Sequence, residues 1–323
     1  MSNGSDVIIG TPGDDTIEAG GGSDIVSGGG GNDTIDGGSG FDVITGGAGN
    51  DAIDGSEGFD VIDGGDDNDW LRGSEGDDVV SGGAGRDRIG GGDGNDVLDG
   101  GAGNDLLRGG AGADVLSGGN GIDVASYAES SAAVSINLAT HINHGGSAEG
   151  DIISNDIEAI HGSRFDDTLT GDAGDNILRG LGGDDTLTGG GGTDRLVGGG
   201  GADRIAGGTG ADTLIGGNGA DSFVYTSAGE TGTTLATRDV IVDLTDGDRI
   251  DLGAIDADGN AGNGDTAFSF IGRAAFSGQA GELRFDAAGG LAVVSADIDG
   301  DGQADLSIAL LGGHIPVAGD FVL

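Results

Sequence analysis

The sequence predicts an all-β fold, a parallel β-roll (a β-helix solenoid) in two repeat blocks with a C-terminal β cap. Three observations predict it. A nine-residue period runs through most of the chain, the eighth position of each repeat is apolar, and glycine fills 78 of 323 positions while aromatic residues make up 4%. A chain with so few large side chains cannot build an ordinary globular core. A short, strict period instead indicates repeats that stack on their neighbours.

The first repeat block spans residues 1–126. Its frame runs unbroken from Gly10 to Ser126, which makes thirteen repeats, and residues 1–9 keep enough of the pattern for a degenerate capping repeat. The sixth position of every repeat is aspartate. These residues are Asp15, Asp24, Asp33, Asp42, Asp51, Asp60, Asp69, Asp78, Asp87, Asp96, Asp105, Asp114 and Asp123.

The second block spans residues 162–224 and holds seven repeats. Its sixth positions are Asp167, Asn176, Asp185, Asp194, Asp203, Asp212 and Asp221. Asn176 has lost the charge, so we expect weaker cation binding there. The fourth position is glycine except at Asp67 and Phe165. Aspartate tolerates the left-handed backbone region, but phenylalanine there predicts a distorted first turn.

Each repeat is expected to form a turn followed by a short strand. The glycines permit positive φ angles and a tight turn, and the x-apolar-x triplet that follows makes a strand with one side chain facing inward. Two repeats then close one coil of eighteen residues. Successive coils stack their strands in parallel, so each sixth-position aspartate is expected to lie over the one two repeats later.

The charge of the chain indicates a cation-binding role. Acidic residues number 57 against 12 basic ones, for a net charge of −45, and 49 of the acids are aspartates. Short carboxylates among glycines suit a hard cation such as calcium, and folding would then be coupled to binding. A solvated acidic surface is the alternative, but the regular spacing argues against it. So acidic a chain repels nucleic acid.

The repeat G-G-x-G-x-D-x-U-x, as at Gly28–Asp36, resembles the RTX (repeats-in-toxin) calcium-binding nonapeptide. The resemblance implies multiple calcium ions, each held between the turns of repeats n and n+2. It also implies that the sixth-position aspartates of both blocks are ligands, together with turn carbonyls. Terminal repeats, which lack a stacking partner on one side, are expected to bind poorly.

Residues 127–161 break the period. The alternation at Val134–Leu138 predicts a strand, and later isoleucines offer apolar anchors. The favoured interpretation is an insert that continues or flanks the roll, and the alternative is a partner-binding surface.

Residues 225–323 contain less glycine and are expected to form a compact β cap. Strand-like runs occur at Val240–Leu244, Ala267–Ile271, Glu282–Phe285, Leu291–Ala296 and Leu306–Leu311. The region resembles the C-terminal part of serralysin-type metalloproteases. Its ending, Asp320–Leu323, is similar to the uncleaved signal of type I secretion. The resemblance implies a type I exporter as partner and an extracellular location, and the N-terminus shows no cleavable signal.

A second type of calcium site is predicted near the C-terminus. Asp297, Asp299, Asp301 and Asp305 occupy positions 1, 3, 5 and 9 of a loop that matches the first part of an EF-hand. The twelfth residue is Ile308 instead of glutamate, so a solvated acidic turn is the alternative. A weaker candidate comprises Asp256, Asp258 and Asn260.

No catalytic or cofactor site is expected. The chain has four histidines, no H-E-x-x-H motif, no cysteine and no apolar run long enough for a membrane span. Trp70 is expected to be an isolated exposed aromatic.

The sequence therefore predicts a secreted calcium-binding protein that folds on extracellular calcium and acts as a structural or surface/matrix interaction protein. The alternative is a secretion and folding module of a larger or multi-subunit exoenzyme or toxin. An enzyme with an unfamiliar site is a remote third. The repeat frame opens directly at Met1, which favours a complete small protein.

Overall fold

The computed structural model describes residues 4–260 and 265–323, so Met1–Asn3 of the expected capping repeat lie outside it. The chain forms two compact units, Met1–His161 and Gly162–Leu323. Both consist almost entirely of β-strands, which confirms the predicted all-β class and the parallel roll.

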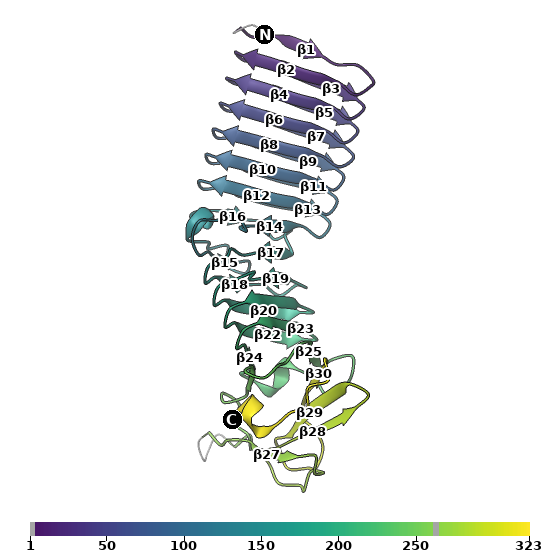
Figure 1. The fold of residues 1–323 in the computed structure, drawn as a ribbon, viewed down its shortest axis with the longest axis vertical. Coiled ribbons are helices and arrows are strands. Elements are labelled where there is room, and N and C mark those ends of the chain that lie inside the picture. The colour runs from purple at the N-terminus through teal and green to yellow at the C-terminus, as the bar shows by residue number, and fades with distance from the viewer. Residues whose placement is uncertain (1–3, 261–264) are drawn as a thin grey trace. The chain divides into compact units, whose positions relative to one another are not determined.

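Two parallel sheets form most of the first unit, and the strands from β1 to β14 alternate between them (Figure 1). The first sheet, sheet A, contains β1 (Val7–Ile9), β3 (Ile25–Gly30), β5 (Val43–Ala48), β7 (Val61–Asp66), β9 (Val79–Ala84), β11 (Val97–Ala102), β13 (Val115–Asn120) and β16 (Ile152–Ile153). The facing sheet, sheet B, contains β2 (Thr16–Gly21), β4 (Thr34–Ser39), β6 (Ala52–Glu57), β8 (Trp70–Glu75), β10 (Arg88–Asp93), β12 (Leu106–Ala111), β14 (Val124–Ser126) and β17 (Ala159–His161).

The register confirms a coil of eighteen residues. Ile25 pairs with Val43, and Val43 pairs with Val61. The eighth-position side chains, such as Ile44 and Leu98, are buried between the sheets and form the core. Most strands of the repeats are six residues long, against the three expected, because the ladder continues through the first glycines of the next repeat.

The turns use left-handed backbone at the second and fourth positions. Glycine meets this demand at most of them, but Ser56, Asp67 and Leu181 also have positive φ, at 77°, 76° and 80°. Asp67 thus behaves as predicted. Phe165 avoids the left-handed region, and its turn is instead fastened by Ser163, whose hydroxyl donates to Asp167 at 2.9 Å.

The insert at residues 127–161 pairs with the roll of the first unit. Ile152 aligns with Val115, and Ala159 aligns with Val124, both in parallel. The predicted strand at Val134–Leu138 is present as β15 (Ser135–Asn137). A single 3-10 turn, η1 (Gly146–Ala148), precedes β16.

The second unit also places parallel strands alternately in two sheets. One contains β18 (Thr168–Thr170), β20 (Thr186–Gly192), β22 (Arg204–Gly210), β24 (Ser222–Val224), β26 (Arg249–Asp251) and β31 (Phe321–Val322). The other contains β19 (Ile177–Arg179), β21 (Arg195–Gly200), β23 (Thr213–Asn218), β25 (Asp239–Ile241), β30 (Leu306–Leu310), β29 (Leu291–Asp297), β28 (Glu282–Ala288) and β27 (Ser269–Gly272).

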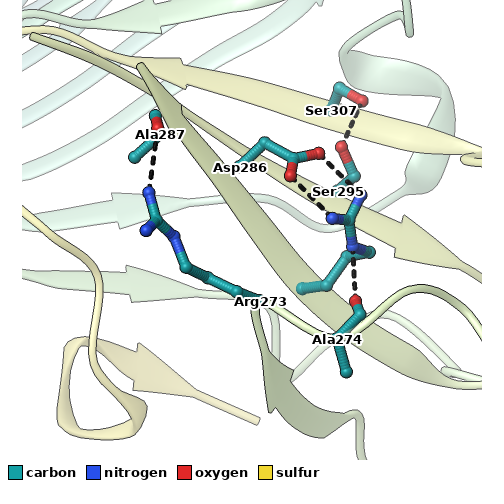
Figure 2. Close-up of polar contacts among 7 residues, drawn as sticks. Arg273, Ala274, Asp286, Ala287, Ser295 and Ser307 are labelled. Carbon is teal, nitrogen blue, oxygen red and sulfur yellow. Dashed lines mark hydrogen bonds and ion pairs between the residues drawn. The ribbon is translucent and has the colours of Figure 1, made fainter. Parts of the chain in front are cut away.

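Parallel pairing continues beyond residue 224, because β25 and β26 pair with β23 and β24. The strands β28, β29 and β30 then pair antiparallel. Two arginine side chains hold this part together. Arg273 donates to the Ala287 carbonyl at 2.8 Å, and Arg284 of β28 donates to the Ala274 carbonyl and to Asp286, both at 2.7 Å (Figure 2). Two short 3-10 turns, η2 (Ala228–Glu230) and η3 (Ala318–Asp320), complete the unit. No helix in the described part of the chain could cross a membrane.

Candidate calcium sites

The sixth-position aspartates form hydrogen-bonded ladders along the turns, and we call each of these residues a rung. The backbone N–H of one rung donates to Oδ1 of the rung eighteen residues later. Asp24 donates to Asp42 at 2.7 Å, and Asp42 donates to Asp60 at 2.8 Å. The same contact recurs through both blocks, from Asp6 to Asp123 and from Asp167 to Asp221. The predicted stacking of each aspartate over the one two repeats later is confirmed.

The second carboxylate oxygen of the interior rungs has no partner. In these rungs Oδ2 is buried and makes no hydrogen bond within the described residues. The residues are Asp24, Asp33, Asp42, Asp51, Asp60, Asp69, Asp78, Asp87, Asp96, Asp105, Asp114, Asp123, Asp185, Asp194, Asp203, Asp212 and Asp221. Buried polar atoms in proteins almost always have a hydrogen-bonding or metal partner. A series of buried oxygens without one therefore indicates a missing partner.

At most of these rungs the orphaned oxygen lies near a backbone carbonyl beside the first-position glycine, although the repeat of Asp24 has Ala19 at that position. A Cβ placed on Gly37 would lie 2.8 Å from Asp42 Oδ2 and 2.8 Å from the carbonyl oxygen of Gly55. Gly37 has an ordinary φ, so it is required for space and not for backbone freedom. The first-position glycine therefore opens a small cradle in which a carboxylate oxygen and a carbonyl oxygen converge.

Burial disfavours the charged form of these rungs. Loss of hydration, followed by repulsion from the neighbouring rungs, raises the pKa to about 7 at Asp60, Asp69, Asp96, Asp185 and Asp194. The hydrogen bond from the preceding rung lowers the pKa but does not offset the burial. A bound cation would remove both penalties.

The donor set fits calcium. Carboxylate and carbonyl oxygens are hard ligands, and calcium accepts six to eight of them in flexible geometry. The orphaned Oδ2 atoms and the adjacent turn carbonyls are the groups that would hold it. At Asn176 the Oδ1 atom accepts a hydrogen bond from the Asp172 N–H at 2.8 Å, so the expectation of a weaker site there stays a prediction.

Four acidic residues outside the repeats continue the ladders, and the nine-residue period did not predict them. Asp114 donates to Asp151 Oδ1 at 2.9 Å, and Asp123 donates to Glu158 at 3.0 Å. In the second unit Asp239 and Asp248 accept in the same way. The signal was present: each of the four precedes an x-apolar pair, as in Asp151-Ile152-Ile153, without the glycines of the full repeat.

Some rungs are capped: their Oδ2 atom, which has no partner in the interior rungs, accepts a hydrogen bond. In three of them a hydroxyl group donates to Oδ2. At Asp167 the donor to Oδ2 is the backbone N–H of Ser163, whose hydroxyl donates to Oδ1. The capped rungs and their partners are Asp15 with Thr11, Asp151 with Tyr127, Asp167 with Ser163 and Asp248 with Thr245. Calcium ligation by Asp15 and Asp167 therefore stays a prediction, and their caps are competing partners.

The C-terminal acidic loop brings three of its four predicted ligands together. Carboxylate oxygens of Asp297, Asp299 and Asp305 lie within 4.8 Å of one another, and Asp297 is fully buried. Both oxygens of Asp297 accept loop N–H groups, those of Gly300 and Gly302. Asp301 lies outside this group.

Asp301 accepts the N–H of Gln303 at 2.8 Å. The weaker candidate behaves similarly, since Asp256 accepts from Thr266 and Asp258 accepts from Asn260. Calcium binding at both loops stays a prediction.

Solved structures with significant similarity include the AlgE6R2 and AlgE6R3 subunits of the mannuronan C5-epimerase from Azotobacter vinelandii. AlgE6R2 is 26% identical, covers 48% of this chain and 91% of its own, and has a TM-score of 0.36. AlgE6R3 is 27% identical, covers 48% of this chain and 78% of its own, and has a TM-score of 0.20. The extracellular lipase LipA from Serratia marcescens is 16% identical over 90% of this chain and 40% of the lipase, with a TM-score of 0.23. A comparison with curated protein sequences finds no significant match.

Family models account for nearly the whole chain. The model of the serralysin C-terminal region of M10 peptidases matches residues 180–323. The RTX calcium-binding nonapeptide-repeat model matches residues 2–35, 27–62, 54–89, 63–98, 90–125, 154–187 and 161–196, which together exceed half of the chain. With the repeat register and the buried aspartate ladders, these matches show that the chain belongs to the RTX calcium-binding repeat family and has a serralysin-type C-terminal region.

Proposed function

We propose that this RTX protein is exported unfolded and folds outside the cell when calcium fills its turns. The observation that carries the proposal is the series of buried Oδ2 atoms without a partner, most of them beside a turn carbonyl. In the absence of a cation these carboxylates are dehydrated and repel one another. Calcium supplies the missing interaction, so binding and folding are expected to be one event.

The C-terminus supports this order of events. Phe321 is buried in β31 and pairs with Ile250. Asp320 accepts the N–H of Val317 at 2.8 Å and lies 2.8 Å from His314 Nε2. The residues that resemble a type I signal are thus part of the folded sheet, so an exporter would read them before folding. RTX repeats with a serralysin-type region are typical of type I secreted proteins.

The proposed role outside the cell is structural, or that of a surface or matrix interaction protein. Both matched regions are non-catalytic modules, which supports binding over catalysis. The alternative is a secretion and folding module that works with a catalytic polypeptide. Sedimentation of the protein from culture medium of the producing cell separates the two: a single species favours the first role, and a stable complex with a hydrolase favours the second.

Calcium titration of the purified full chain tests the folding proposal. Small-angle scattering and circular dichroism are expected to show an expanded chain with little β signal after chelation. A compact β-rich protein should form at about 10⁻⁴–10⁻³ M calcium, the range of extracellular modules. Magnesium at equal concentration is the control. A chelated protein as compact as the calcium-loaded one would overturn the proposal.

A further inference from the structure

Three of the four arginines of residues 1–161 lie on the outer face of sheet B, and the fourth lies in an adjoining turn. Arg72, Arg88 and Arg108 project from β8, β10 and β12, and Arg86 precedes β10. Trp70, which is 65% exposed, lies among them. The prediction that Trp70 is exposed is confirmed, and its strand neighbour is Arg88. We call these five residues the Trp–Arg face.

The strand register sets their spacing. Trp70 is the direct neighbour of Arg88, which is followed by Leu106 on the next strand. In the second row Gly90 separates Arg72 from Arg108. A Cβ on Gly90 would meet nothing within 4 Å, so an open gap lies between the two guanidinium-bearing side chains. They are two strands apart, or roughly 9–10 Å.

These charges do not serve the fold. Arg108 pairs with Glu129 at 3.2 Å, but Arg72, Arg86 and Arg88 make no ion pair with any described residue. Exposed arginines of this kind add little stability. The equivalent seventh positions of sheet A, in strands β9, β11 and β13, are occupied by valines without any basic residue, so the roll folds without such side chains.

The face is hollowed on both sides of Arg88. One hollow of about 310 Å³ has Gly90 in its lining, together with Trp70 and Arg72. A larger hollow of about 750 Å³ runs toward the turns, and Trp70 and Arg88 line this hollow as well. Its other lining residues include the amides of Asn50, Asn68 and Asn104 and the rungs Asp51, Asp69, Asp87 and Asp105, whose charge the proposed calcium ions would neutralise. The two hollows therefore join a flat aromatic surface, unpaired guanidinium groups and hydrogen-bonding amides.

We propose that the Trp–Arg face binds an acidic glycan whose sugars carry carboxylate groups. Guanidinium groups bind carboxylates through two parallel hydrogen bonds, and the indole offers a broad amphipathic surface for a sugar ring. The spacing of Arg72 and Arg108 suits a charge on every second sugar. Duplex nucleic acid, with a charge about every 1.7 Å, is repelled far more strongly by a chain of net charge −45.

Binding on this face rests on the proposed calcium function. Only the folded roll aligns β8, β10 and β12, and only cations in the turns reduce the negative field that would repel an acidic ligand. Calcium is thus expected to create the face and to make it accessible to anions. The interaction should weaken as sodium chloride is added, because it depends on charge.

The test uses the calcium-loaded full chain and isothermal titration calorimetry with a hyaluronan octasaccharide, which carries carboxylates only. A chondroitin sulfate octasaccharide tests whether sulfate can substitute, and maltooctaose is the neutral control. Trp70→Thr and Arg88→Thr place at these sites the residue found at Thr34, and each should weaken binding by about tenfold. The matched control is Arg195→Thr, at the same repeat position in β21, which should leave the affinity unchanged.

Circular dichroism in calcium separates the two proposals. A protein that folds but binds none of the acidic octasaccharides overturns the glycan proposal alone, whereas a protein that does not fold in calcium overturns the proposed function first. Equal binding of maltooctaose, or equal loss in Arg195→Thr, also overturns it. So does calcium-dependent self-association, measured by sedimentation, that disappears in Arg88→Thr, because the occupant would then be a second copy of the chain.

Discussion

The interior rungs and the capped rung of the insert share one backbone arrangement but differ at one oxygen. Asp96 and Asp151 both accept the N–H of the rung before them, at 2.8 and 2.9 Å. Oδ2 of Asp96 is buried without a partner, whereas Oδ2 of Asp151 accepts the Tyr127 hydroxyl at 2.8 Å. Asp96 thus leaves an acceptor free for a cation, whereas the chain itself satisfies both oxygens of Asp151.

The difference teaches how a metal-dependent ladder ends inside a protein. An isolated last rung would expose a half-built cation site. Tyr127, itself buried, closes it with a neutral donor, and the nearby carboxylate raises the pKa of the phenol further after burial has raised it. Asp151 therefore extends its ladder with both carboxylate oxygens satisfied by the chain.

Filling a cradle should have the largest effect. A Cβ at Gly180 would collide with Asp185 Oδ2 and lie 2.7 Å from the Gly198 carbonyl. Gly180→Ala is expected to remove calcium binding in that turn and to cost about 2–4 kcal/mol in the free energy of unfolding of the second unit in calcium. Chemical denaturation measures it.

The control is Gly200→Ala, where a Cβ meets nothing within 4 Å and φ is ordinary. If both variants were equally stable, the cradle would not be a binding site.

Neutralising an interior rung should have the next largest effect. Asp96→Asn keeps the acceptor for the Asp78 N–H but removes the charge that calcium needs. The free energy of unfolding in calcium should fall by about 1–3 kcal/mol. Asp151→Asn should change the calcium midpoint less, because its Oδ2 already has a hydrogen-bonding partner. Calcium titrations followed by circular dichroism compare the two, with the exposed Asp63→Asn as control. If Asp151→Asn shifted the calcium midpoint more than Asp96→Asn, the interpretation of Asp151 as a capped rung would be wrong.

Acid should partly replace calcium at the interior rungs. Burial raises the pKa of Asp60, Asp69 and Asp96 to about 7 in the fold, above the value of the unfolded chain. Their contribution to stability without calcium is therefore present at low pH and lost as the pH rises through about 7.

The calcium-free chain should hold more β structure at about pH 5 than at about pH 8. Its affinity for calcium should be lower at about pH 5 than at about pH 8. Circular dichroism after exhaustive dialysis measures the first effect. A calcium-free chain that is less folded at the lower pH would contradict it.

Removing the cap hydroxyl should have the smallest effect. Tyr127→Phe loses one hydrogen bond, worth about 1 kcal/mol, and leaves Asp151 with a free oxygen like that of an interior rung. A double-mutant cycle with Asp151→Asn isolates the pair. Additive effects of the two changes would show that the hydroxyl and the carboxylate do not interact in solution.

The repeats were predictable because a single period fixes both the coil and the aspartate stacking. The eighth-position residues and the rungs followed from spacing alone. The continuation through Asp151 and Asp239 did not, because these segments lack the glycines on which the period was recognised. The cap on Asp151 could not be predicted either, since Tyr127 and Asp151 are 24 residues apart and meet only when the insert folds back. The Trp–Arg face required the register that brings β8, β10 and β12 side by side.

The alternation of strands between sheets A and B makes the parity of the repeat count important. Gain or loss of two nonapeptides adds or removes one coil and leaves every later side chain on its own sheet. Gain or loss of a single nonapeptide would transfer all later strands to the opposite sheet, and a change between β8 and β10 would divide Trp70 from Arg88. Lengthening this molecule in pairs preserves its surfaces, whereas an odd step exchanges them.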